Sequence, residues 1–505
     1  MSSQHSSGEE LAHGSLGTKG LVLMVLAALA PLTLVVTLTP LVLIEGGVTA
    51  PGLYLVAGAI MFVFSVGWMA MSRYVRHAGA FFATVSYGLG RPAGAGAAFV
   101  AVLAFLGLQI ATYGVFGVFT ADILAGRLSI EVPWWAIAIA IAAIITYIAY
   151  RGVLVSARLL GIALVLEVVT LLGLAAGVLI SGGDSGLNLG SSYDPTEMFS
   201  SGKGVSLILI IGAFAGFEAA VNFSEEARGG YSTVRRATFF SVLFIGLFYS
   251  VVTWIIVQAY GESNALGAAE ADPVGLVTAA FDRYAAWLSP MMEALLIMSM
   301  FAALLALHSA TNRYLFALGR AEVLPRSIAR TGAGTNAPYI AGVSQTAIVV
   351  IVVGAWALLG LDPYLQLSLW GTALGVHEVG VWALACVAIV IYLGKHAPHT
   401  PILQRVVAPV LAFCGFIIII VMVVQNIALL TGDRTAVNIT LLALGPVVFA
   451  CGALRALHMR AVRPAAYERL ALLDADAAEA DDKPVAAEPL PLSNDSAGES
   501  GLKDA

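Results

Sequence analysis

The sequence predicts an all-α integral membrane protein with twelve transmembrane helices. Of its 505 residues, 59% are hydrophobic and only 11% are charged, whereas a typical soluble domain has about 25% charged residues. The mean hydropathy is +0.91. Apolar stretches of about 20 residues, the length that a helix needs to cross a bilayer, recur from about residue 20 to residue 459 with no polar domain between them.

The twelve predicted helices are apolar stretches separated by short polar loops. Glycine and proline interrupt several of them, so their ends are set only to within a few residues. The predicted helices lie near residues 20–44, 51–73, 95–124, 133–150, 156–181, 204–224, 237–260, 288–312, 338–360, 364–393, 403–431 and 436–457.

The basic residues orient these helices in the membrane. With the N-terminus inside, eighteen Lys and Arg residues fall in the predicted cytoplasmic segments, and four fall in the outer loops, namely Arg127, Lys203, Arg283 and Arg434. Positive residues gather on the cytoplasmic side of membrane proteins. We therefore expect a multi-pass protein of the inner (plasma) membrane with both termini in the cytoplasm.

The chain divides into five parts: a cytoplasmic N-terminal segment (1–19), two sets of five helices (20–181 and 204–393), two further helices (403–459) and an acidic tail (460–505). The first segment lacks the basic start and cleavage site of a signal peptide, so we expect the first helix to stay in the mature protein. The tail has ten acidic and five basic residues and few large apolar ones. This composition predicts a disordered, solvated tail, with a regulatory role as the alternative.

Helix breakers lie near the middle of the first and the sixth predicted helix. In the first helix, Pro40 follows Pro31 and removes one backbone hydrogen bond, so we expect the carbonyls just before Pro40 to lack partners. The sixth helix places Gly212, Gly216 and Glu218 at mid-membrane. Broken helices at corresponding positions of two halves are typical of inverted-repeat transporters with a binding site at the membrane midplane. The alternative is that these residues only kink their helices.

Three stretches of the sequence resemble the amino acid–polyamine–organocation (APC) transporters. They match the end of the second helix and the first cytoplasmic loop, the sixth helix, and the eighth helix with the loop after it. The stretches are Met71–Phe82 continuing to Gly88–Gly94; Gly212–Ala220 followed by Ser224–Arg228; and Asn312–Arg320 with Leu324-Pro325 and Ala337-Pro338-Tyr339. The resemblance covers about residues 18–395, and three matches in the right order are specific.

The resemblance implies a LeuT-like APC fold, in which helices 1–10 form a five-plus-five inverted repeat and helices 11 and 12 are peripheral. It also implies secondary transport by alternating access, with a substrate carboxylate held by backbone N–H groups at the break of the first helix and an amine held by carbonyls at the breaks. A half-helix N-terminus does offer free donors and a positive dipole. Relatives carry small residues where Thr37 and Leu38 stand, which leaves the substrate open.

Ten residues are candidates for substrate binding, either because they lie at the predicted breaks or because the resemblance points them at the pocket. Gln109 and Tyr113 are one turn apart in the third helix and share a face. Phe214 is a candidate lid over the substrate. The alternatives are an interhelical hydrogen bond for Gln109 or Tyr113 and core packing for Phe214. The full set is Val36, Thr37, Leu38, Thr39, Gln109, Tyr113, Phe214, Ala215, Gly216 and Phe217.

Three residues are candidates for proton coupling, because a charged carboxylate at the bilayer centre costs about 2.5 kcal/mol or more. Glu167, in the middle of the fifth helix, stands where some proton-coupled APC transporters keep a lysine, and it could load and release a proton. Glu218 is a second such group, and Ser299 of the eighth helix is expected to face Glu167. The alternatives are a permanently protonated Glu167 bonded between helices and a helix-dipole contact for Glu218. In the tenth helix His377 and Glu378 point about 100° apart and are not predicted to form a pair.

The sequence favours a permease over an enzyme. It contains no Walker motif, no HExxH motif and no nucleophile elbow, and its three cysteines lie in apolar stretches without zinc spacing. The near-neutral body argues against nucleic-acid binding. We expect import of an amino acid or related small amine together with a proton, in a lipid bilayer, with no cofactor and no metal. The alternatives are a proton-independent exchanger, a transporter-like sensor that signals through the acidic tail, and a passive channel. The oligomeric state is left open.

Overall fold

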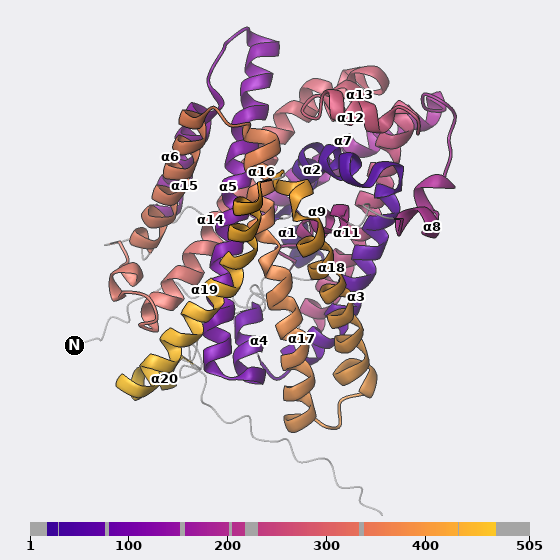
Figure 1. Ribbon diagram of the computed structural model, residues 1–505. Helices are drawn as coiled ribbons and strands as arrows, with labels where there is room; N and C mark the ends of the chain where they lie inside the picture. The colour runs from indigo at the N-terminus through magenta and orange to yellow at the C-terminus, as the bar shows by residue number, and fades with distance from the viewer. Residues whose placement is uncertain are drawn as a thin grey trace, which may run out of the picture.

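The computed structural model describes residues 18–28, 30–75, 80–151, 157–200, 205–217, 231–332, 338–432 and 434–470, and every regular element in these residues is a helix (Figure 1). Most of the long helices run lengthwise through one bundle (Figure 1). The α-helices of the described residues are α1 (Thr18–Ala28), α2 (Pro31–Gly46), α3 (Ala50–Ser72), α4 (Ala80–Leu89), α5 (Arg91–Leu128), α6 (Trp134–Tyr150), α7 (Ala157–Ser181), α8 (Pro195–Met198), α9 (Val205–Gly212), α11 (Tyr231–Tyr260), α12 (Ala265–Ala271), α13 (Leu276–Tyr284), α14 (Ser289–Arg320), α15 (Tyr339–Leu359), α16 (Ser368–Gly375), α17 (His377–His396), α18 (Ala408–Thr431), α19 (Thr435–Val462) and α20 (Pro464–Arg469).

Nine helical stretches in the described residues are long and apolar enough to cross a bilayer. The first of them, Pro31–Ser72, contains α2 and α3 together. The fourth predicted helix corresponds to α6, which has only 17 residues, and the sixth is described only as far as Phe217. The prediction of an all-helical, multi-span membrane protein is therefore confirmed, whereas the count of twelve stays a prediction.

The long helix α5 runs through the bundle and packs against α16 and α19, while α3 packs against α11 and α18. Small residues allow α5 and α16 to approach closely. A Cβ atom added to Gly371 of α16 would lie 2.5 Å from the carbonyl oxygen of Gly107 on α5 and 2.8 Å from the Cβ of Ala111. The two backbones are thus in direct contact, as is common where membrane helices associate through small residues.

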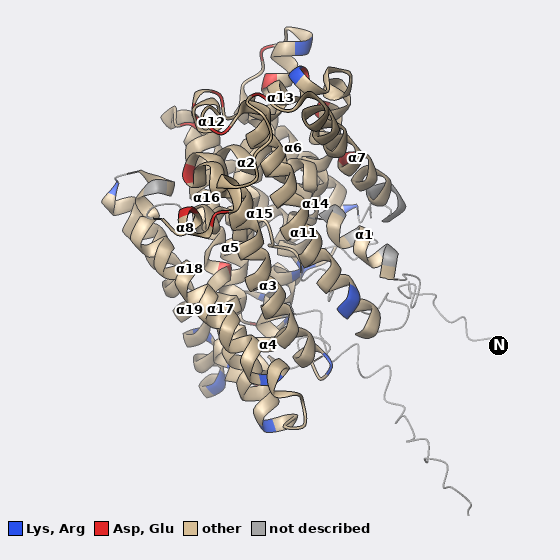
Figure 2. Ribbon diagram, turned by 90° about the vertical axis from the view of Figure 1, so that its right-hand side faces the viewer, with Lys and Arg blue, Asp and Glu red and all other residues tan. Residues whose placement is uncertain are grey.

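Charged residues separate toward the two ends of the bundle. Figure 2 shows most Lys and Arg residues at the end that holds α4 and most Asp and Glu residues near the opposite end, around α8, α12 and α13. The shafts of the helices between these ends are almost free of charge. A membrane protein needs this arrangement, because charged side chains are tolerated in the headgroup region and not in the hydrocarbon core.

An ion cluster ties the loop after α14 to the end of α19. Glu322 accepts hydrogen bonds from Arg326 and from Arg463, the latter at 2.8 Å, and Arg455 of α19 donates to the carbonyl oxygens of Glu322 and Val323 at 3.1 and 3.2 Å. The Arg326 guanidinium, supported by Arg463, holds the pKa of the Glu322 carboxyl below its ordinary value. The cluster therefore stabilises the basic end of the bundle.

Replacing Glu322 with glutamine is expected to lower the melting temperature at neutral pH. A carboxyl whose pKa is depressed in the folded state adds stability above its unfolded-state pKa, and this stability disappears as the pH falls through the folded-state value. The difference between wild type and Glu322→Gln, measured by thermal unfolding in detergent, should therefore shrink on acidification. The same change at the exposed Glu131 is the control. Equal melting temperatures for wild type and Glu322→Gln at neutral pH would show that the cluster adds no stability.

Candidate functional site

The first membrane segment is broken just before Pro31. Helix α1 ends at Ala28, and Ala30 takes a left-handed conformation with φ 47° and ψ 69° before Pro31 starts α2. A non-glycine residue rarely adopts a positive φ, so this break is a built feature of the chain. Proline is well suited to the first position of a helix, since its missing N–H has no partner there in any case.

The predicted break at Val36–Thr39 is wrong, because these residues lie inside the continuous helix α2. Pro40 removes only one hydrogen bond, and the helix runs on through it to Gly46. The carbonyl that loses its helical donor at Pro40 is that of Val36, and the next carbonyl, that of Thr37, accepts a hydrogen bond from the Tyr364 hydroxyl at 2.8 Å. Leu38 and Thr37 are partly buried, and Val36 and Thr39 are fully buried.

The contact between Tyr364 and Thr37 leads to a testable change in stability. Tyr364→Phe leaves the Thr37 carbonyl without this donor, and we expect the free energy of unfolding to fall by about 1 kcal/mol. Unfolding in detergent measures the change, with Tyr339→Phe as control, because Tyr339 is 37% exposed. A Tyr364→Phe variant as stable as wild type would mean that the carbonyl finds another donor.

The sixth membrane segment is also interrupted, at the predicted glycines. Helix α9 ends at Gly212, and residues 213–217 form turns in which Gly216 has φ 96°. The hydrogen bonds along this turn join residues three apart, from Ala213 N–H to the Ile210 carbonyl through to Phe217 N–H to the Phe214 carbonyl. Glu218 lies outside the described residues.

The N-terminus of α2 is met by a buried carboxylate. The backbone N–H of Leu32 donates to Oε2 of Glu167, on α7, at 3.0 Å. Glu167 is 4% exposed. Ser299 of α14 lies beside the same carboxylate, as the sequence led us to expect, although its hydroxyl has no hydrogen-bond partner among the described residues. The negative side chain and the positive end of the half-helix stabilise one another.

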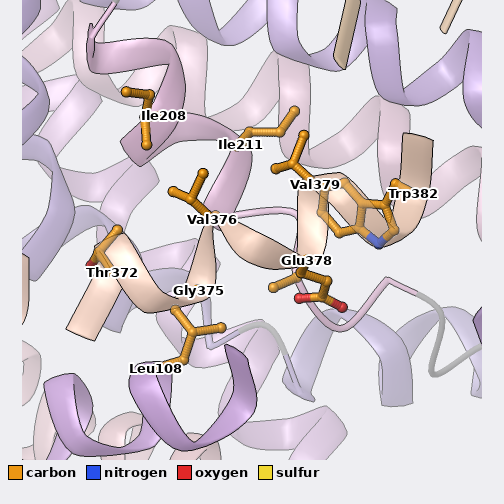
Figure 3. A pocket seen from close by; sticks show the side chains of 11 residues that line it. Leu108, Ile208, Ile211, Thr372, Gly375, Val376, Glu378, Val379 and Trp382 are labelled. Carbon is orange, nitrogen blue, oxygen red and sulfur yellow. The ribbon is translucent and has the colours of Figure 1, made fainter. Parts of the chain in front are cut away.

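A small cavity lies between α5, α9, α16 and α17, next to the second break (Figure 3). Its volume of about 10 Å³ is roughly that of one water position, so the site is closed. Glu378 of α17 is one of the residues that line the cavity (Figure 3) and is 3% exposed. The lining residues are Leu108, Ile208, Ile211, Gly212, Ala215, Thr372, Gly375, Val376, Glu378, Val379 and Trp382.

Of the ten predicted substrate residues, Ala215 is the one among the residues that line this cavity. Gln109 and Tyr113 follow the lining residue Leu108 on α5. Gln109 and Tyr113 are almost completely buried, and their polar side-chain atoms have no hydrogen-bond partner within the part of the chain that is described. Buried polar groups usually have partners, so the side-chain amide of Gln109 and the hydroxyl of Tyr113 can bind water or a ligand.

An aromatic cluster adjoins the cavity residue Trp382. Phe217 follows the second break, and its ring centroid lies 5.3 Å from that of Trp68 and 6.1 Å from that of the cavity residue Trp382. The ring centroid of Phe81, on α4, lies 4.6 Å from that of Trp68. Phe217 and Phe214 are both fully buried. Phe217 thus belongs to this aromatic cluster, which joins α3, α4, α17 and the broken segment.

A larger cavity of about 310 Å³ lies between α5 and α16–α19. Its lining is apolar apart from His377, whose Nε2 is 2.9 Å from the Leu441 carbonyl oxygen. Neither α2 nor α9 lines this cavity. Because it contacts neither helix break, we place the candidate site at the small cavity that contains Glu378.

Comparison with known proteins identifies the family. Residues 16–449 match the family described as "Amino acid permease". The chain is 34% identical over 154 residues to the branched-chain amino acid permease BcaP of Lactococcus lactis subsp. cremoris, which covers 30% of this chain and 31% of that relative. It is 25% identical over 241 residues to the low-affinity putrescine importer PlaP of Escherichia coli, which covers 46% of this chain and 50% of that relative. The chain thus matches half or less of the length of these curated relatives.

The family match and the fold agree. The matched region extends over most of the chain, and the described residues form a bundle of apolar helices that can cross a membrane. The resemblance to APC transporters is therefore confirmed. The protein belongs to the amino acid permease family, and its described residues form helices long and apolar enough to cross a membrane several times.

Proposed function

We propose that the protein imports an amino acid or a related small amine across the plasma membrane by alternating access, coupled to proton entry, with both termini in the cytoplasm. In this proposal residues 20–181 and 204–393 form two inverted repeats, and Glu167 carries the coupled proton. The observation that carries the proposal is the contact of the Glu167 carboxylate with the free N-terminus of α2.

The position of Glu167 supports proton coupling. Its carboxylate is buried between α7, α2 and α14, where a charge costs about 2.5 kcal/mol or more. The Leu32 N–H and the dipole of α2 offset part of this cost for the charged form. The charged and protonated forms therefore favour different positions of α2 relative to α7, and a proton can bias the movement of the broken helix.

The closed cavity supports alternating access. A volume of about 10 Å³ does not hold an amino acid or an amine, so the helices around it must move apart to admit a substrate. The left-handed Ala30 between α1 and α2 and the turn with Gly216 at the end of α9 are points at which these segments can bend. The aromatic cluster around Phe217 includes the cavity residue Trp382, so a movement of this cluster would change the lining of the cavity.

Uptake into proteoliposomes tests this function. Purified full-length protein is exposed to an imposed pH gradient, alkaline inside, with the membrane potential held at zero by potassium and valinomycin. We expect labelled valine or putrescine to accumulate above its external concentration and to leave again when a protonophore is added. Saturable exchange without accumulation would instead identify a proton-independent exchanger. The absence of any saturable flux of amino acids and amines would contradict the proposal.

A further inference from the structure

We propose that one acyl chain of a membrane phospholipid binds in the larger cavity, the space of about 310 Å³ between α5 and α16–α19. This lipid site is distinct from the small cavity beside the second break, and the inference does not depend on which substrate the protein carries.

The mouth of the larger cavity lies at the depth of the hydrocarbon core. Val424 of α18 and Pro446 of α19 both line the cavity and are both exposed. At 1.5 Å per residue, Val424 is about 10 Å from the end of α18 at Thr431, and Pro446 is about 16 Å from the start of α19 at Thr435. These helices belong to segments long and apolar enough to cross a hydrocarbon core about 30 Å thick. In a membrane the mouth is therefore surrounded by lipid.

From this mouth the cavity extends into the interior of the bundle. Ala373 and Val381 line it and are only 4% and 2% exposed. Gly380 lines it as well, and a Cβ atom added to this glycine would meet nothing within 4 Å, so open space reaches the backbone of α17. Val376 lines both this cavity and the small one. An occupant would thus lie one side chain away from the candidate functional site.

The helices around the mouth are irregular beside the cavity. Asn426 has non-helical dihedral angles within α18, with φ −122° and ψ 18°, and Pro446 interrupts the hydrogen bonds of α19. The ring of His377, on α17, packs directly on α19: its Nε2 is 2.9 Å from the Leu441 carbonyl oxygen, and a Cβ atom added to Gly445 would collide with its Nδ1. This imidazole fixes the spacing of α17 and α19 next to the cavity.

The lining suits a hydrocarbon chain better than water. Among the described residues that line the cavity, none is Asp, Glu, Lys or Arg, and His377 is the single polar side chain. A buried water needs about two to four polar partners, and the Leu441 carbonyl already occupies Nε2 of His377. Empty space would cost the lining side chains their dispersion contacts, whereas a lipid tail is as apolar as leucine. The volume also falls within the range of ligand cavities, about 300–1,000 Å³.

Photolabelling of the wild-type protein tests the lipid site. Purified full-length protein is placed in phosphatidylcholine vesicles that contain a trace of phosphatidylcholine with a diazirine in the middle of one acyl chain. The residues labelled on irradiation are mapped by mass spectrometry. Lipid at the surface of the bundle can reach the exposed Val424 but not the buried Ala373 and Val381. We expect label at Ala373 or Val381 as well as at Val424. The absence of label from both Ala373 and Val381 would overturn the inference.

A side chain that fills the cavity should exclude the acyl chain. In Gly380→Phe the added ring takes up the open space beside α17, so we expect the label at Ala373 and Val381 to be lost while the label at Val424 remains. Gly354→Phe is the matched control and should keep both. Gly354 lies in α15, is not among the residues that line the cavity, and also has nothing within 4 Å of an added Cβ. Equal labelling of Ala373 and Val381 in wild type and in folded Gly380→Phe would overturn the inference.

The proposed function and this inference can fail separately, because the labelling needs no substrate. Label at the buried residues without uptake of amino acids or amines would leave the lipid site intact. Uptake without such label would leave the transport function intact. Since the wild-type labelling needs no substitution, the test does not depend on whether Gly380→Phe folds, which its melting temperature in detergent establishes.

Discussion

Glu167→Gln is expected to abolish accumulation driven by a pH gradient while substrate exchange continues. Glutamine keeps an oxygen that can accept the Leu32 N–H, so the contact with α2 can persist, but it cannot bind and release a proton. One pH unit corresponds to about 1.36 kcal/mol, so with one proton per substrate it supports about tenfold accumulation. In the variant the ratio of internal to external substrate should fall to about one.

The measurement uses proteoliposomes with the membrane potential held at zero, so that a cationic substrate cannot accumulate in response to voltage. Counterflow of labelled substrate is recorded in the same preparation to establish that the variant is folded and still exchanges. Glu131→Gln serves as control and should accumulate substrate as the wild type does. Unchanged concentrative uptake by Glu167→Gln would remove this residue from the coupling mechanism.

Gly371→Leu is expected to destabilise the protein and to disrupt the site at the same time. The added side chain would begin 2.5 Å from the Gly107 carbonyl oxygen and 2.8 Å from the Cβ of Ala111, and backbone atoms cannot yield as a flexible side chain can. Overpacking of this kind typically costs about 1–3 kcal/mol. Since α5 carries Gln109 and α16 leads into Glu378, separation of the two helices should also weaken ligand binding.

Gly354→Leu is the matched control for this prediction. Gly354 lies in the membrane helix α15, and a Cβ atom added to it would meet nothing within 4 Å. Melting temperatures in detergent should fall by about 1–3 °C for Gly371→Leu, the shift that about 1–3 kcal/mol gives at this chain length, and change little for Gly354→Leu. Similar melting temperatures for the two variants would show that the α5 to α16 contact is not as tight as the geometry indicates.

The sequence allowed the class of fold and the second break to be predicted. Apolar runs of membrane-spanning length identify helices whatever their neighbours in the bundle, because the bilayer imposes the same length on each helix. Gly212 and Gly216 sit within a largely apolar run of the sequence, and Gly216 takes the positive φ that glycine permits without strain. In this segment the local signal and the structure agree.

The first break could not be placed correctly from the prolines alone. Proline ends a helix in some positions and begins one in others, and Pro31 and Pro40 illustrate both outcomes. Pro31 is the first residue of α2, whereas Pro40 is accommodated within it. The residue that actually leaves the helical region is Ala30, and an alanine gives no sequence signal for a left-handed conformation.

The contacts of the two central carboxylates differ in how far they could be foreseen. A glutamate in an apolar membrane segment suggests function by itself, and this rule selected Glu167. The same rule applies to Glu378, but the angle of about 100° between Glu378 and His377 argued only against a pair. In the structure the two residues line different cavities. The bond from Leu32 to Glu167 joins residues 135 positions apart, and only the packing of α2 against α7 creates it.

Solute counterflow tests the central claim most directly, namely that the chain is a carrier with a closed site beside the turn at residues 213–217. Proteoliposomes are loaded with unlabelled valine or putrescine and diluted into a trace of the labelled compound, in the absence of any ion gradient. The account predicts a transient, saturable accumulation of label above equilibrium in wild-type vesicles and its loss in Gly371→Leu vesicles. Flux that rises in proportion to concentration without any overshoot would contradict it, because a channel behaves in that way and a carrier does not.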